Sequence, residues 1–219
     1  VDATQDYVDE PLMQFQSAPS FDINPNNRAR AIDRTLRWAL TAVPVPIGAN
    51  MVLSADGVRF VDAHAAAERP ETWLALFEAA VAGGVGVSDE AINCVQQHAA
   101  RFTAEDFFPT RAHKTALLRF LRPRPGLYAR LSEMHDTGLL GQMVPEFKAI
   151  SFLVVRDFYH KYTVDEHTLL TIRNLERLVT DAPPERERFA RLLGELEAPE
   201  HVVLSLLLHD VGKWSEEDH

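Results

Sequence analysis

The 219-residue sequence predicts a mainly α-helical fold with one small β-hairpin. From Pro70 onward, apolar residues recur at helical spacing, and prolines or glycines separate the periodic stretches. The second observation is a pair of short apolar runs that flank Asp56-Gly57, a pattern typical of a tight hairpin. The composition, 46% hydrophobic and 25% charged, is that of an ordinary globular protein with enough apolar residues to bury a core.

The first 125 residues are expected to be a connector followed by a helical region. Residues 1–27 lack periodicity and are expected to be a connector or a poorly ordered terminus. The helical region, residues 28–125, begins with a helix over Arg28–Ala42, which ends before a Val-Pro-Val-Pro stretch because proline does not continue a helix. The hairpin at 51–61 is too small to be stable alone and must pack on the helices around it.

Further helices are predicted along the middle of the chain. One begins at Pro70, ends at a run of glycines and carries a buried stripe of Trp73, Leu76, Phe77 and Ala80. The next opens at Ser88, and two more are expected over Ala112–Leu121 and Leu127–Thr137. The stretch Phe152–Tyr159 is apolar enough to be expected in the core.

Thr163-Val164-Asp165-Glu166 has the pattern of a capping box and predicts a helix that runs to about Val179. His167 then lies in the first turn of that helix. The positive end of the helix dipole disfavours a charged imidazolium there, and neutral imidazole is the form that binds metals.

The final predicted helix begins at Pro199-Glu200, is apolar almost all round and is therefore expected to be buried, with Gly212 ending it. His209 and Asp210 stand near its carboxyl end. An aspartate there meets the negative end of the helix dipole and loses hydration, so it needs a positive partner. A bound cation would supply that partner, and Lys213 would supply part of it.

Other candidate residues have structural interpretations. An adjacent His-Asp pair is common by chance. A functional role for His209-Asp210 is favoured by the buried helix before it, by the Gly-Lys after it and by His167 on a second, capped helix. His160 could equally be a ligand or a core histidine bonded to a backbone carbonyl. His201 is expected to be structural, and Cys94 to be a small core residue. His219 follows an acidic run, so it is either part of a solvated surface or a further ligand or phosphate contact.

Several classes of protein are excluded or disfavoured. The single cysteine excludes an intrachain disulfide and fits a reducing compartment, here the cytoplasm. A net charge of −10 argues against nucleic-acid binding through bulk basic charge. No apolar run reaches the roughly 18 residues of a membrane span. Dinucleotide-binding, Walker A, CxxC and GxSxG patterns are all missing from the sequence. The non-Met start and polar end suggest a piece of a longer protein.

His167 followed by His209-Asp210 resembles the HD superfamily of metal-dependent phosphohydrolases. Arg156–Thr168 is similar to a specific D-x-x-H-x-Y-T-V-D-E-H block of the bacterial PII uridylyltransferase/uridylyl-removing family. The stretch from Gly126 to Phe147 resembles the segment that leads into the HD domain of that family. The resemblance implies that residues 126–219 are the first part of an HD-type helical domain, left incomplete.

The resemblance also implies a function. The full enzyme of this family would be bifunctional: one domain transfers UMP from UTP to a tyrosine of PII, a nitrogen-status signalling protein. The HD domain would hydrolyse that UMP–tyrosine phosphodiester with a divalent metal (Mg, Mn, Fe or Zn) and with glutamine as effector. His167, His209 and Asp210 would be metal ligands and His219 a further one. Asp210 and Lys213 would be the catalytic residues, with Lys213 on the phosphate side.

Two departures from the family limit this expectation. The nucleotidyltransferase motif is missing from the sequence, so this piece is not expected to transfer UMP. The last metal-binding aspartate of the family would lie beyond residue 219, so hydrolysis by this piece alone is not expected, and exposed apolar surface should make it self-associate. Two alternatives stay open: an HD phosphohydrolase of a free nucleotide, and a non-catalytic helical regulatory or docking module.

Overall fold

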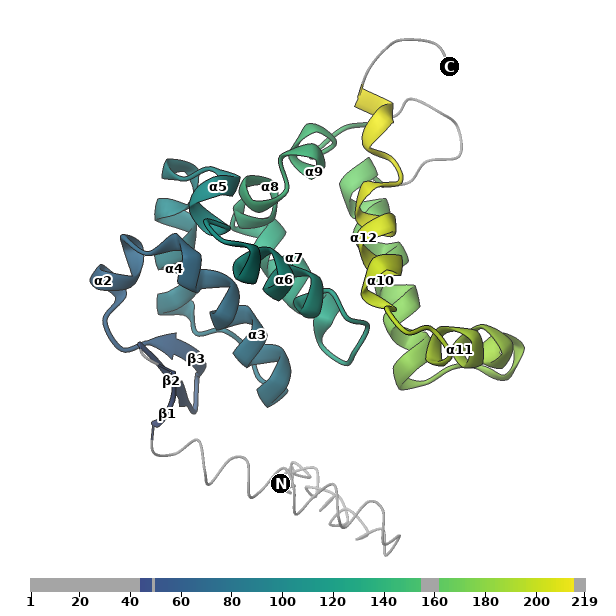
Figure 1. Cartoon of the computed structure of the whole chain (residues 1–219), viewed down its shortest axis with the longest axis horizontal. Coiled ribbons are helices and arrows are strands. Elements are labelled where there is room, and N and C mark those ends of the chain that lie inside the picture. Colours follow the sequence, from purple (N-terminus) through teal and green to yellow (C-terminus); the bar gives the residue numbers. More distant parts are fainter. Residues whose placement is uncertain (1–43, 49, 155–161, 215–219) are drawn as a thin grey trace, which may run out of the picture. The chain divides into compact units, whose positions relative to one another are not determined.

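The computed structural model describes residues 44–48, 50–154 and 162–214. Contacts divide the chain into two units, 1–39 and 40–219, and every described residue belongs to the second. That unit is mainly helical with one small antiparallel sheet, which confirms the predicted fold class (Figure 1). The connector and helix predicted before residue 43 lie outside the described residues. Within the described part, no helix combines the length and the hydropathy needed to cross a bilayer.

The sheet precedes the helices in the chain. The strands are β1 (Val45–Gly48), β2 (Met51–Ser54) and β3 (Gly57–Phe60). The first helices are α2 (Ala63–Ala67), η1 (Pro70–Thr72), α3 (Trp73–Gly83), α4 (Asp89–His98), η2 (Ala99–Arg101), α5 (Ala104–Phe107) and α6 (Arg111–Phe120). The later helices are α7 (Leu127–Asp136), α8 (Leu139–Met143), α9 (Pro145–Ala149), α10 (Val164–Thr180), η3 (Pro184–Arg186), α11 (Glu187–Gly194), α12 (Glu200–Leu208) and η4 (Val211–Trp214).

The predicted hairpin is confirmed, and a third strand extends it. β2 and β3 pair antiparallel from Met51↔Phe60 to Ser54↔Gly57. β1 adds to the other edge of β2, in the stretch interpreted from the sequence only as a helix stop. Pro46 fits this strand because β1 is at the edge of the sheet, where a missing N–H is tolerated.

The hairpin turn differs from the prediction by one residue. Ala55 and Asp56 form the turn, and Gly57 already pairs as the first residue of β3. A tight hairpin turn over Asp56-Gly57 would place both residues at positive φ, but only Gly57 has a positive φ, 113°. Gly57 also lies close to the backbone of Gly86, and the next residue, Val58, donates its N–H to the Gly86 carbonyl at 2.9 Å.

Helix α3 forms the centre of the core, as predicted. The four residues of its predicted stripe are fully buried: Trp73, Leu76, Phe77 and Ala80. The indole N–H of Trp73 donates to the Ala66 carbonyl at 2.8 Å, and the ring packs edge-on against Phe102 at 5.7 Å. The helix ends at Gly84, whose left-handed backbone (φ 61°) closes the last turn.

The prediction that Phe152–Tyr159 is buried is wrong for Phe152 and Val154, whereas Leu153 is half-buried against the core. Phe152 is 80% exposed and Val154 is 65% exposed, and the rest of the stretch lies outside the described residues. Phe152 has φ 59°, a left-handed conformation that strains a non-glycine residue. Its N–H donates to the buried carboxylate of Asp165 at 2.9 Å. This hydrogen bond holds the backbone in a conformation that turns the ring outward.

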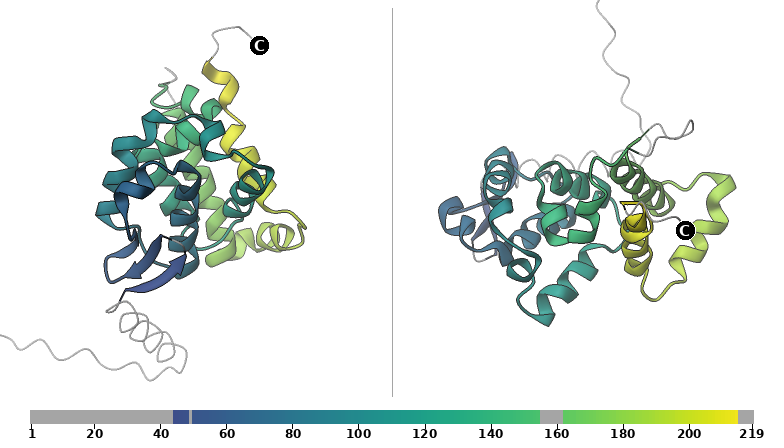
Figure 2. Two further views of the ribbon diagram at one scale, coloured as in Figure 1. Left: turned by 60° about the vertical axis from the view of Figure 1, so that its left-hand side comes forward. Right: turned by 90° about the horizontal axis from the view of Figure 1, so that it is seen from above.

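Helices α10 and α12 lie side by side, and the views in Figures 1 and 2 agree on this. Helix α10 begins where the capping box predicts. The prediction for α12 is wrong in two respects. Only Val203 and Leu207 of α12 are buried, because one side of the helix packs on α10, α6 and α9 and the other faces outward. Gly212 does not end the helix: α12 ends at Leu208, and Gly212 lies within η4.

Candidate metal site

Helix α10 holds the first candidate ligand, His167, in its first turn. The capping box is present: the Thr163 side chain binds a main-chain amide of the first turn, and Glu166 accepts from the Thr163 N–H. The His167 N–H donates to the Thr163 carbonyl at 2.9 Å and closes the first helical bond. The local sequence thus fixes the backbone that carries this imidazole.

The other two candidate ligands stand on the turn that follows α12. His209 and Asp210 form this turn between Leu208 and η4. The Nδ1 of His209 lies 2.6 Å from the Leu206 carbonyl oxygen. Because a carbonyl oxygen only accepts, Nδ1 carries a hydrogen, and in the neutral ring Nε2 then has the lone pair. Nε2 is therefore the nitrogen of His209 that is available to bind a metal.

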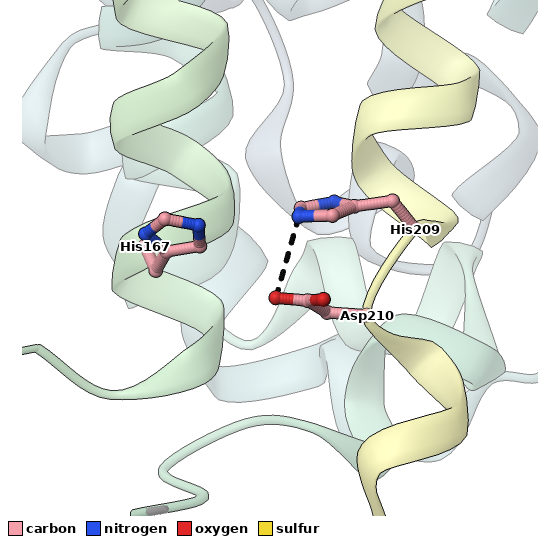
Figure 3. Close-up of side chains that lie close together, drawn as sticks. All are labelled: His167, His209 and Asp210. Atoms are coloured by element: carbon pink, nitrogen blue, oxygen red, sulfur yellow. Dashed lines mark ion pairs between the residues drawn. The ribbon is translucent and has the colours of Figure 1, made fainter. Parts of the chain in front are cut away.

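The structure brings these three side chains together (Figure 3). One ligand atom from each of His167, His209 and Asp210 lies within 4.8 Å of the others. The two imidazole rings are 5.9 Å apart, and the Nε2 of His209 is 3.3 Å from the Oδ2 of Asp210. We call this group the HHD triad. Asp210 is buried, and both imidazoles reach solvent.

The chemistry of the HHD triad fits a divalent cation. Its donors are two imidazole nitrogens and one carboxylate oxygen, the mixed N/O set that suits Mn²⁺, Fe²⁺ or Zn²⁺ better than Ca²⁺. Asp210 is only 7% exposed, and a buried carboxylate is unfavourable unless a positive charge or hydrogen bonds compensate it. The hydrogen bond that orients His209 through Nδ1 is the kind that commonly supports a metal-binding histidine.

Of Lys213, His219, His160 and His201, the structure describes only the side chain of His201, and it lies away from the HHD triad. Lys213 lies in η4, three positions after Asp210, but its side chain is not among those described. His219 and His160 lie outside the described residues. His201 is exposed in the first turn of α12, at the opposite end of the helix from His209.

A second histidine–aspartate pair was not predicted as part of a site. The Nε2 of His135 on α7 lies 3.1 Å from the Oδ2 of Asp165 on α10, and Asp165 is only 1% exposed. Oδ1 of Asp165 accepts the Glu166 N–H at 2.9 Å. Both residues stood in motifs noted in the sequence, but spacing alone gives no sign that α7 and α10 bring them into contact.

The pKa of Asp165 is set by opposing effects. Burial raises the pKa of this carboxyl, but hydrogen bonds from the Thr163 hydroxyl and from two main-chain amides outweigh burial, and His135 adds to them. The net result is a pKa below the usual value. Asp165 is therefore a carboxylate at neutral pH and fixes the start of α10, two residues before His167.

Comparisons with known proteins give relatives but no family model. The chain is 35% identical over 136 residues to a bifunctional uridylyltransferase/uridylyl-removing enzyme of Azotobacter vinelandii, covering 61% of this chain and 15% of the relative. An enzyme of the same description from Thiobacillus denitrificans is 31% identical over 189 residues, covering 85% of this chain and 22% of the relative. One from Pseudomonas putida is 34% identical over 138 residues, covering 61% and 15%.

The chain thus spans less than a quarter of the length of these relatives. No protein-family model matches it. The search of solved structures also gave no match. What the comparisons establish is homology, over part of each relative, to enzymes that are described as both uridylyltransferases and uridylyl-removing enzymes.

Proposed function

We propose that the HHD triad binds a divalent metal and serves the uridylyl-removing half of a bifunctional enzyme, hydrolysing the UMP–tyrosine phosphodiester of a PII signalling protein. The observation that carries this proposal is the convergence of His167 on α10 with His209 and Asp210 on the turn after α12, with one ligand atom of each within 4.8 Å of the others. The homology to enzymes whose description includes uridylyl removal supports the choice of reaction. Residues 126–219 are the proposed hydrolase region.

The described residues have separate roles in this proposal. His167 and His209 supply nitrogen ligands, and Asp210 supplies the charge that neutralises part of a dication. A bound divalent cation would supply Lewis acidity at a phosphoryl oxygen and would make water more acidic. The hydrogen bond from His209 to the Leu206 carbonyl holds the ring in one tautomer, so this ligand needs no reorganisation.

Two further residues complete the proposal. Lys213 follows Asp210 on the short helix η4, and its ammonium group is proposed to face the phosphate as a point charge. His219 is proposed as an additional ligand. The PII partner, UTP as the source of the uridylyl group and glutamine as effector belong to the whole enzyme of the family that the sequence resembles.

The experiment measures metal-dependent release of UMP from uridylylated PII. Wild type, His209→Ala and Asp210→Asn are compared in Mn²⁺ in the longest natural protein that contains this chain. His201→Ala is the matched control, because His201 is on α12, the helix that leads into the turn, and is outside the HHD triad. Release should fall at least a hundredfold in the two triad variants and stay unchanged in the control.

Each other outcome contradicts a defined part of the proposal. Release that is unchanged in His209→Ala rejects the site. Metal-dependent release of phosphate or nucleoside from a free nucleotide, with none from uridylylated PII, rejects the substrate. Metal binding without hydrolysis of any phosphodiester in the longer protein rejects catalysis and leaves a regulatory or docking role.

A further inference from the structure

A second group of metal-binding side chains lies far along the chain from the HHD triad, between α2 and α4. A shallow depression of about 570 Å³ is lined there by His64 of α2 and by Glu90, Cys94 and His98 of α4. We call these four residues the α2–α4 cluster. Nothing in the proposed hydrolase function uses them.

The backbone places the four side chains on facing surfaces. Glu90, Cys94 and His98 are spaced by four residues, so they lie along one face of α4. Helix α2 packs against α4, and the Ala63 carbonyl oxygen is 3.5 Å from the Sγ of Cys94. His64 is the next residue after this contact, which is why it lines the same depression.

The tautomer of His98 suits a ligand. Its Nδ1 lies 2.8 Å from the Cys94 carbonyl oxygen and must donate to it, so in the neutral ring Nε2 has the lone pair. This is the same arrangement that orients His209 in the HHD triad.

The surroundings of Cys94 disfavour a free thiolate, and a bound cation would offset this effect. Burial raises the pKa of the Cys94 thiol, and the nearby charge of Glu90 raises it further. Cys94 therefore stays a neutral thiol at neutral pH and is a poor nucleophile. A metal ion would reverse both effects, because it replaces the thiol proton and neutralises the carboxylate.

We propose that the α2–α4 cluster binds a transition-metal ion of the Zn²⁺ type through Cys94, His98, His64 and Glu90. One thiolate, two imidazoles and a carboxylate form a tetrahedral donor set for such an ion. The four donors are more widely spaced than those of the HHD triad, the one group of three within 4.8 Å among the described residues. Binding therefore requires the exposed His64 and Glu90 to rotate inward, and the bound ion would link α2 to α4.

The single cysteine gives this proposal a specific readout. A thiolate bound to Co²⁺ absorbs in the near ultraviolet, and Cys94 is the only cysteine in the sequence. The band therefore reports this cluster and not the HHD triad. Titrating the reduced chain with Co²⁺ should produce the band to a limit of one ion per chain, and Zn²⁺ should remove it by displacement. Zn²⁺ should also protect Cys94 from thiol-reactive reagents.

Variants test each ligand. His64→Gln changes an exposed side chain, so the protein should fold normally while its affinity for Co²⁺ falls at least about tenfold, a loss typical even of groups that only support a ligand. His98→Gln should do the same, and Cys94→Ser should abolish the band. The triad variant His209→Ala should leave the band unchanged. The proposal is overturned if wild type shows no band. It is also overturned if the Co²⁺ affinity measured from the band is unaltered in both His64→Gln and His98→Gln.

Discussion

The carboxylate of Glu176 on α10 caps the first turn of α7 by accepting the main-chain N–H of Tyr128 at 2.7 Å. Its other oxygen accepts the N–H of Gly126 at 2.9 Å. Gly126 is the N-cap residue of α7 and has no side chain with which to cap it. A residue 50 positions later therefore supplies the missing cap and ties α10, which carries His167, to α7.

Glu176→Ala should lower the free energy of unfolding by about 1–3 kcal/mol, because two partly buried amides lose a charged acceptor. Glu176→Gln should lose less, since its amide oxygen still accepts. Urea denaturation followed by circular dichroism measures both values. Glu185→Ala, at an exposed position of η3, is the control and should change stability little. Equal stability of Glu176→Ala and the control would mean that water satisfies these amides equally well.

Asp165 should make stability depend on pH in the acid range. Its pKa is lower in the folded chain than the value of about 3.9 expected when unfolded, so its contribution is present above that value and is lost as pH falls toward the folded pKa. Asp165→Asn should unfold more easily at pH 7 by about 1–3 kcal/mol, because Asn satisfies the surrounding donors less well. The difference between the two proteins should shrink below pH 4. A constant difference from pH 7 to pH 3 would contradict this assignment.

Gly57 and Gly138 show two different reasons why a position requires glycine. Both have a positive φ, 113° and 75°, but a Cβ at Gly57 would collide with the Gly86 carbonyl, whereas a Cβ at Gly138 meets open space. Gly138→Ala should cost about 1–2 kcal/mol, the penalty of a left-handed residue. Gly57→Ala should cost clearly more, because the backbone contact between β3 and Gly86 must also open. Thermal unfolding of the two variants tests the order.

Metal binding should stabilise the chain through Asp210. When the free Mn²⁺ concentration is a hundred times the dissociation constant, binding should raise the wild-type free energy of unfolding by about 2.7 kcal/mol. Asp210→Asn should lose most of this gain, because it removes the charged oxygen ligand of the HHD triad. Mn²⁺ suits this test because it binds thiolates weakly and so avoids the α2–α4 cluster. His201→Ala should respond to Mn²⁺ as wild type does.

Exposed apolar side chains around α11 should cause self-association. Phe189 is 58% exposed, Leu192 is 46% exposed and Leu196 is 45% exposed. Sedimentation should show a molecular mass that rises with concentration, and Phe189→Ser should move the equilibrium toward monomer. Arg188→Ser, beside it and also exposed, is the control. A single mass at every concentration for wild type would contradict the prediction.

The sequence predicts best where the signal is local. The capping box at Thr163, the buried stripe of α3 and the hairpin at β2–β3 all depend on residues within one or two turns, and the structure confirms each. Strand β1 was missed because Pro46 signals a break in a helix as strongly as it marks an edge strand. The burial of α12 was overestimated because an all-apolar helix pattern does not say how many sides are covered.

In the candidate site, too, the sequence predicts local features but not the contacts that depend on how helices pack. His167 and His209-Asp210 were recognised because each lies at an interpretable helix end, and the structure places them together. His135 and Asp165 were missed because their contact depends on how α7 packs against α10. Phe152 was expected in the core because apolar character does not reveal a backbone with φ 59° that turns its side chain outward.

The two helices that position the HHD triad should differ in local stability. His167 stands on a 17-residue helix with a capped start, whereas His209 and Asp210 follow a 9-residue helix with only two buried side chains. The amides of α12 should therefore exchange hydrogen with solvent faster than those in the first half of α10. Each opening of α12 separates the ligands. The free energy of this opening therefore determines how far the apparent metal affinity falls below the intrinsic affinity of the closed site. Anything that clamps α12 onto α10 would tighten metal binding without touching a ligand.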